Sequence, residues 1–171
     1  MACARTLLLL CVACAGSSLG VDRPVVGAST TPLEPAVDFA FDSLDDRPVS
    51  SEAMRGKLTV VAFVTTGSLP AQAQVGFLVA MARNDAKRVN YVVVALDARE
   101  NCELVELYAK SLSIPFPVAL ADNPTRSGSG AFGDVTRVPV TVLLDRSGRT
   151  IWRVGGRVAK SDEIRAAMRG L

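Results

Sequence analysis

The sequence predicts an α/β sandwich built on a mixed β-sheet. Two runs, 58–64 and 91–96, are continuously apolar and rich in β-branched residues, which is typical of strands buried on both faces. A segment with helical spacing of apolar residues follows each run. A third apolar run, 140–144, is joined by turn residues to 149–154, and this pattern predicts an antiparallel hairpin. Strands that alternate with helices and end in a hairpin and a terminal helix favour this fold class.

The chain before the first buried strand predicts one further strand. Residues 37–41 alternate apolar and polar side chains, as a half-buried strand does. Residues 45–48, Asp-Asp-Arg-Pro, have the composition of a turn. We therefore expect the strand at 37–41 to reverse direction before the chain enters the core.

Two longer helices are expected between the strands. Pro70 suits the first turn of a helix that runs to about Arg83. Its core face is expected to hold Val75, Leu78, Val79 and Ala82. A second helix is expected over about 100–112. Its core face is expected to hold Leu104, Leu107 and Tyr108.

The carboxyl-terminal third predicts two more helical segments. Asn123-Pro124 opens a short one, and the last helix starts near Ser161. Acidic residues occupy the first turn of the last helix and arginines lie near its end, the order that the helix dipole favours. Trp152, on the last strand, is expected to pack under this helix.

The composition fits one globular domain with a substantial core. The chain has 171 residues, of which 49% are hydrophobic and 21% charged. Its net charge of +2 is too balanced to indicate a nucleic-acid partner or an anionic surface. The sequence contains no His, and its Cys, Asp and Glu residues do not cluster in a zinc-binding pattern, so we expect no metal and no cofactor.

The amino-terminal residues predict export. Residues 1–14 combine one arginine with a short apolar run and small residues, which is typical of a signal peptide. The triplet ending at Cys14 resembles a bacterial lipoprotein box, which would make Cys14 the lipidated residue. Ordinary cleavage after Ala13 or Ala15 is the alternative. Residues 15–33 read as a flexible tether, and the folded domain is expected over 34–171, in the periplasm or anchored to a membrane.

Four short signatures occur in order along this domain. They are Pro35–Phe39, Met54–Lys57, Phe63–Ala71 and Val138–Gly148. Together they resemble the TlpA-like, redoxin branch of the thioredoxin superfamily. The resemblance implies an α/β, thioredoxin-like three-layer sandwich with a mixed central sheet and an N-terminal β-hairpin.

The resemblance also implies where a functional site would lie. Proteins of this branch carry Trp-Cys-x-Pro-Cys in the loop after the first buried strand, facing a cis proline. Here Ser68 and Ala71 stand at the two cysteine positions, while Pro70 remains. The cis peptide bond is expected at Val138–Pro139.

The loss of both thiols changes the expected chemistry. Dithiol exchange needs one thiolate to attack and a second to resolve the mixed disulfide. Neither Ser68 nor Ala71 can do this, so the dithiol activity of the branch is not carried over to this chain. Without His, a Ser68 hydrolase would lack its usual base, and Ser68 is expected to cap the following helix instead.

Cys102 is the one thiol that would remain after the leader and Cys14. A lone cysteine is most often a packing residue. Its predicted place in the first turn of a helix leaves open a reactive thiol, although neighbouring glutamates oppose a thiolate.

We therefore expect a binding protein rather than an enzyme of the dithiol type. The expected partner is a protein or an extended peptide in the cell envelope. The expected binding residues are Thr66, Gly67, Ser68, Leu69, Pro70, Val138 and Pro139. Two alternatives stay open: an oxidoreductase or antioxidant redoxin acting through Cys102 or through unrecognised chemistry, and a purely structural envelope lipoprotein. A membrane contact is expected only through a lipid on Cys14.

Overall fold

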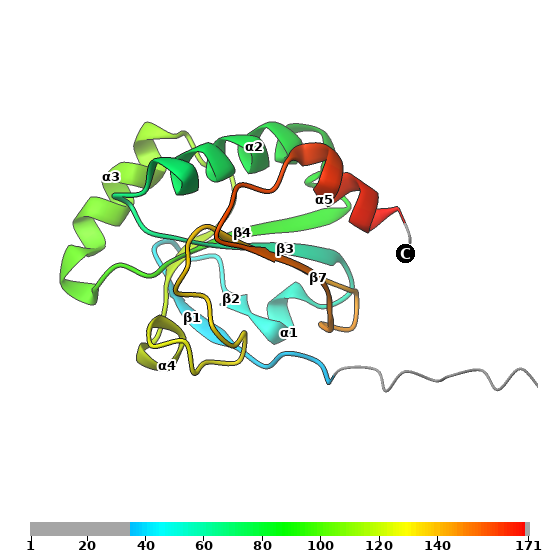
Figure 1. Ribbon diagram of the computed structural model, residues 1–171, viewed down its shortest axis with the longest axis horizontal. Coiled ribbons are helices and arrows are strands. Elements are labelled where there is room, and N and C mark those ends of the chain that lie inside the picture. Colours follow the sequence, from blue (N-terminus) through cyan, green and yellow to red (C-terminus); the bar gives the residue numbers. More distant parts are fainter. Residues whose placement is uncertain (1–34, 170–171) are drawn as a thin grey trace, which may run out of the picture. The chain divides into compact units, whose positions relative to one another are not determined.

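The structure is a computed structural model that describes residues 35–169 (Figure 1). The predicted signal peptide, Cys14, the tether and Glu34 lie outside the described residues. The strands are β1 Ala40–Ser43, β2 Val49–Ser50, β3 Leu58–Val64, β4 Val89–Ala95, β5 Val118–Leu120, β6 Val140–Leu144 and β7 Thr150–Gly155. The helices are α1 Ser51–Met54, α2 Leu69–Asp85, α3 Cys102–Ser111, α4 Asn123–Arg126 and α5 Ser161–Met168, with a 3₁₀ turn at Arg99–Asn101.

The strands form one mixed seven-stranded sheet in the order β2-β1-β5-β4-β3-β6-β7. The central strand β3 pairs in parallel with β4 and antiparallel with β6. Its residues Val60–Val64 are fully buried, as the continuous apolar run predicts. The predicted N-terminal hairpin is present, because β1 and β2 pair antiparallel with Phe41 opposite Val49.

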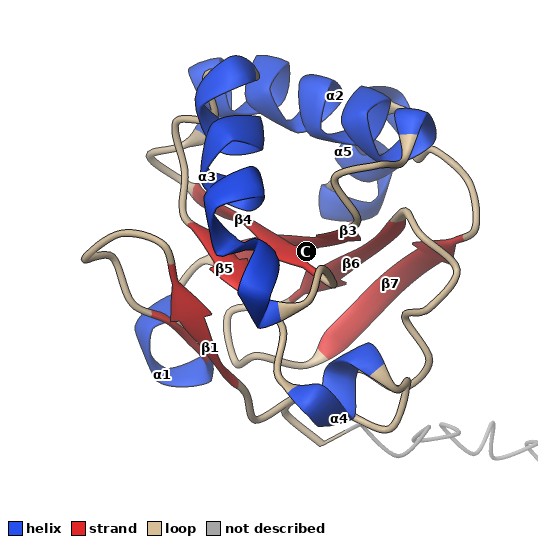
Figure 2. Ribbon diagram, turned by 90° about the vertical axis from the view of Figure 1, so that its left-hand side faces the viewer, coloured by secondary structure: helices blue, strands red, loops and turns tan. Residues whose placement is uncertain are grey.

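Helices cover both faces of the sheet, which gives the three layers (Figure 2). Helices α2, α3 and α5 lie on one face, and the short α1 and α4 lie on the other. Along β3, side chains alternate between the two cores, with Val60 and Ala62 on the α2 side and Val61 and Phe63 on the opposite side. Within residues 35–169, no helix is both long and apolar enough to cross a bilayer.

The core opposite α2 is aromatic. The ring of Phe132 lies 5.0 Å from that of Phe63 and 5.1 Å from that of Phe39, and the ring of Phe41 also contacts this group. Tilted and edge-to-face contacts of this kind stabilise beyond the area they bury. Phe132 therefore fixes the segment that leads into β6, and this segment forms part of the candidate functional site.

Most of the predicted elements are observed, with shifted ends. Strand β3 has its predicted bounds, and the predicted core face of α2 is buried throughout. Strand β1 begins at Ala40 rather than at Val37. Val37 instead donates its N–H to the carbonyl of Gly148, at 2.8 Å, and Ala36 forms a bridge with Arg149. The start of the described chain therefore lies beside the β6–β7 turn.

The predicted core face of the second long helix is wrong. Leu104 and Leu107 are 50% and 62% exposed, whereas Val105 is fully buried in the core on the α2 side. Tyr108 is buried as predicted, and burial raises the pKa of Tyr108 to about 12. A stripe Leu104/Leu107/Tyr108 and a stripe Cys102/Val105/Tyr108 both have helical spacing. The second stripe is the one that packs on the core, with Val105 and Tyr108 buried and Cys102 half-buried.

A buried polar contact joins α2 to the segment before α5. Gln74 is fully buried, and its amide oxygen accepts the Ala159 N–H at 2.6 Å. The amide nitrogen of Gln74 donates to the carbonyl of Ala159 at 3.2 Å. The side chain thus satisfies both backbone groups of a residue that is itself fully buried.

We expect Gln74→Ala to lower the free energy of unfolding by about 2–4 kcal/mol, because it leaves both buried backbone groups of Ala159 without partners. Urea unfolding of the full chain measures this. The matched control is Gln72→Ala, an exposed position on the same helix, which should stay within about 0.5 kcal/mol of the unchanged chain. Equal effects of the two changes would show that the contact contributes nothing.

Candidate functional site

The loop after β3 enters α2 through a side-chain cap at Ser68. The hydroxyl oxygen of Ser68 accepts the N–H of Ala71 at 3.3 Å, and Pro70 lies in the first helical turn. Helix amino termini leave backbone N–H groups without partners, and a serine oxygen is among the best groups to accept one. Ser68 is therefore a helix cap, as the sequence predicts. Ala71 is fully buried beneath it.

The second segment of the site precedes β6. The Val138–Pro139 peptide bond is cis, as the resemblance implies. Val140 pairs with Phe63, near the carboxyl-terminal end of β3. Pro139 therefore lies beside the point where β3 ends and the Ser68 loop begins. Because β3 and β6 are antiparallel neighbours, the end of one strand and the start of the other meet at the same edge of the sheet.

A hydrogen-bonded pair holds the root of the Ser68 loop. The hydroxyl of Thr66 donates to one carboxylate oxygen of Asp97 at 2.6 Å, and the N–H of Thr66 donates to the other at 3.1 Å. Asp97 follows β4, so the pair joins the ends of two parallel strands. The sequence does not predict this contact. The available signal is that both residues follow adjacent parallel strands, whose carboxyl ends share one edge of the sheet.

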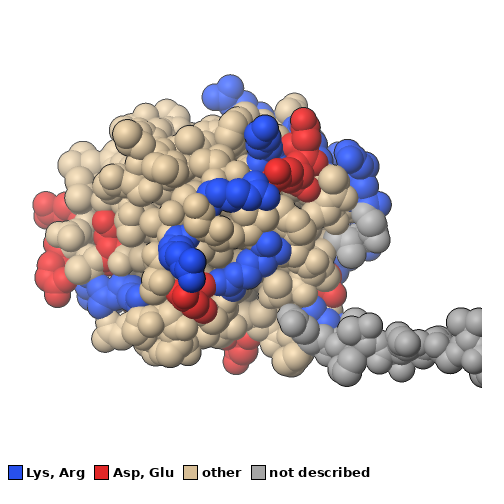
Figure 3. Space-filling view, viewed as in Figure 1, with Lys and Arg blue, Asp and Glu red and all other residues tan. Residues whose placement is uncertain are grey.

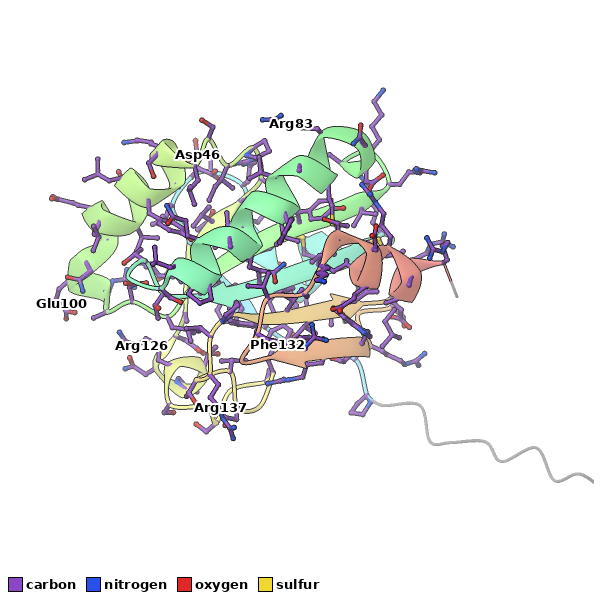
Figure 4. All side chains as sticks on the ribbon, turned by 45° about the horizontal axis from the view of Figure 1, so that its top comes forward. Asp46, Arg83, Glu100, Arg126, Phe132 and Arg137 are labelled. Carbon is purple, nitrogen blue, oxygen red and sulfur yellow. The ribbon has the colours of Figure 1, made fainter. Side chains whose placement is uncertain are left out.

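The segment before the cis bond is fixed from two sides. The guanidinium of Arg153, on β7, donates to the carbonyls of Phe132 and Asp134. The carboxylate of Asp134 accepts both the hydroxyl and the N–H of Thr136, at 2.6 and 2.9 Å, and these bonds hold the pKa of Asp134 below its usual value. Figure 4 shows Phe132 and Arg137 on this segment.

The predicted binding residues differ in exposure. Leu69 is 77% exposed, and Gly67 and Pro70 beside it are also exposed. Pro139 is buried and Val138 is half-buried. The N–H of Val138 donates to the carbonyl of Thr136 at 3.1 Å, whereas its own carbonyl accepts no hydrogen bond from the described residues. Thr66 and Ser68 are half-buried.

Cys102 occupies the first residue of α3, which follows β4 at the same edge of the sheet. Its thiol forms no disulfide within residues 35–169 and is half-buried, and its side chain packs against the core on the α2 side. These contacts fit the role of a packing residue. Within residues 35–169, no three Cys, Asp or Glu side chains come together in an arrangement that could hold a metal ion.

Comparisons with known proteins identify the fold. No family model and no curated protein matches the sequence. Among solved structures, a DsbF homologue from Corynebacterium diphtheriae superposes with a TM-score of 0.70 at 16% identity, over 82% of this chain and 88% of that one. A thiol:disulfide interchange protein of the thioredoxin family from Chlorobium tepidum has a TM-score of 0.68 at 22% identity, over 81% and 95% of the two chains. A secreted Mycobacterium tuberculosis disulfide oxidoreductase homologous to E. coli DsbE has a TM-score of 0.64 at 18% identity, over 79% and 97%.

We expect Ser68→Ala to lower the free energy of unfolding by about 1 kcal/mol, because the Ala71 N–H loses its acceptor. Ser68→Asp should retain the stability of the unchanged chain, since its carboxylate can cap the helix and faces the positive end of the helix dipole. Thermal unfolding at neutral pH distinguishes the two changes. If Ser68→Ala is as stable as the parent, the hydroxyl is not a cap of consequence.

Proposed function

We propose that this chain is a non-catalytic binding protein. It has the thioredoxin fold, but Ser68 and Ala71 stand at the two positions where the resemblance implies cysteines. It binds an extended segment of a protein or peptide across the Ser68 loop and the cis Pro139 segment. The observation that carries this proposal is that the two segments keep their places at one edge of the sheet while neither thiol is present.

Three features of that edge support peptide binding. Leu69 offers an exposed apolar side chain at the tip of the loop. The carbonyl of Val138 is an acceptor without a partner among the described residues, as pairing with an extended backbone requires. The Thr66–Asp97 bonds and the Phe132 aromatic contacts hold the two segments in advance, which lowers the entropy lost when a ligand binds.

The proposal includes export to the cell envelope, with Cys14 as the residue that would carry a lipid. It rests on the leader-like residues 1–14. The secreted Mycobacterium tuberculosis oxidoreductase with this fold is in keeping with it.

In the presence of a supplied dithiol, we expect the full chain to reduce a disulfide substrate no faster than the dithiol does alone. The double variant Ser68→Cys/Ala71→Cys should exceed that background by at least about tenfold, because it restores an attacking and a resolving thiol. Cys102→Ser in the unchanged chain is the control and should alter nothing. If the unchanged chain reduces the substrate and Cys102→Ser does not, the site is Cys102 and the non-catalytic proposal fails.

We expect Leu69→Asp to lower the affinity for short, unstructured, cysteine-free peptides by roughly tenfold or more, since it places a charge where an apolar contact is proposed. Fluorescence anisotropy of a labelled peptide panel measures this. Leu107→Asp, at another exposed leucine on α3, is the matched control and should keep the parental affinity. Equal losses in both variants, or no binding by the parent, would contradict the proposed surface.

A further inference from the structure

The end of the sheet opposite the Ser68 loop is basic. The turn before β3 carries Arg55 and Lys57, and the turn between α2 and β4 carries Lys87 and Arg88. The β6–β7 turn contributes two more cations, Arg146 and Arg149, beside Asp145. The carbonyl of Arg146 accepts the N–H of Gly56 at 2.9 Å. The last turn of α5 and the residue after it add Arg165 and Arg169. The cations of this end therefore come from four separate stretches of the chain.

Four of these arginines line a pocket of about 360 Å³. They are Arg88, Arg146, Arg165 and Arg169, and the floor includes Leu58 and Val89, the first residues of β3 and β4. One carboxylate, that of Asp85, faces the same pocket and lies 3.7 Å from Arg88. Among the described residues, Arg146, Arg165 and Arg169 form no ion pair. The pocket therefore holds four guanidinium groups against one carboxylate.

Acidic side chains gather at the other end of the domain. In Figure 3 acidic side chains lie along the left edge, where α3 lies, and basic side chains lie at the centre and at the right edge, where a second acidic group stands among them. Figure 4 shows Glu100 at the end of the molecule where α3 begins and Arg83 toward the far end of α2. Glu103 and Glu106 on α3 and Asp42 on β1 belong to the acidic end.

The described chain begins at the basic end. Val37 is hydrogen-bonded to Gly148 and Ala36 forms a bridge with Arg149, both in the turn that carries Arg146. The chain that leads from the proposed lipid site at Cys14 therefore enters the domain at its basic end.

We propose that this basic end binds anionic phospholipids, with headgroup phosphates received by the pocket of Arg88, Arg146, Arg165 and Arg169. Planar guanidinium groups donate paired hydrogen bonds to phosphate oxygens. Nearby exposed cations, Arg55, Lys57 and Lys87, add attraction to an anionic surface without needing a fixed geometry. This binding directs the Ser68 loop and Pro139, at the opposite edge of the sheet, away from the membrane.

The test is sedimentation of the full chain with vesicles of phosphatidylcholine alone or mixed with phosphatidylglycerol. Every sample carries Cys14→Ser, so that no acyl group at this position contributes. The apolar residues 6–13 are common to all samples, so the readout is the additional affinity for the anionic vesicles over the neutral ones. Circular dichroism verifies that each variant is folded.

Arg146→Gln/Arg169→Gln should lower the affinity for anionic vesicles by about 25-fold, at roughly fivefold for each charge near the surface. Arg99→Gln/Lys110→Gln removes the same charge from the acidic end and should lower it less than about threefold, since charges beyond the Debye length are screened. Glycerol 1-phosphate at matched ionic strength should not release the protein from the vesicles.

Three results would overturn the proposal. One is a parent chain with no preference for anionic vesicles. Another is an equal loss in the two double variants, which would indicate attraction by net charge alone. The third is release by glycerol 1-phosphate, which would identify the pocket as a site for a soluble phosphate compound rather than for a membrane.

Discussion

The burial of β3 on both faces and its pairing on both edges is the constraint on which the rest of the domain depends. Its side chains divide between the core under α2 and the aromatic core around Phe132, and it pairs with β4 on one side and β6 on the other. A strand fixed in four directions has one register and one direction. Its carboxyl end therefore delivers the Ser68 loop beside Pro139, and its amino end lies on the floor of the arginine pocket.

Much of this constraint could be predicted from local pattern. The run 58–64 is apolar at nearly every position, and the capping serine and Pro70 mark the start of α2 whatever the tertiary context. The face of α3 could not be predicted in the same way. Leu104 and Leu107 are larger and more apolar than Cys102 and Val105, yet they are exposed, because the packing of α3 against the sheet, and not the size of its side chains, decides which face is buried.

Contacts between segments that are distant in the chain could not be predicted from the sequence either. Gln74 reads as an ordinary polar residue of a helix, and only the approach of Ala159 makes it a buried hydrogen-bonding residue. The basic end could not be predicted from the net charge of +2, because a net charge does not show how the charges are distributed over the surface. Arg55, Arg88, Arg146 and Arg169 are far apart in the chain, and it is the topology of the sheet that gathers them.

The methyl group of Ala71 and the hydroxyl of Ser68 have a kinetic consequence. A dithiol protein can hold its client through a mixed disulfide and release it by a chemical step. Ser68 and Ala71 provide no such bond, and Ser68 is already engaged as a cap. Under the proposed function, the lifetime of each complex is therefore set by the dissociation rate alone, and it is indifferent to the redox poise of the compartment.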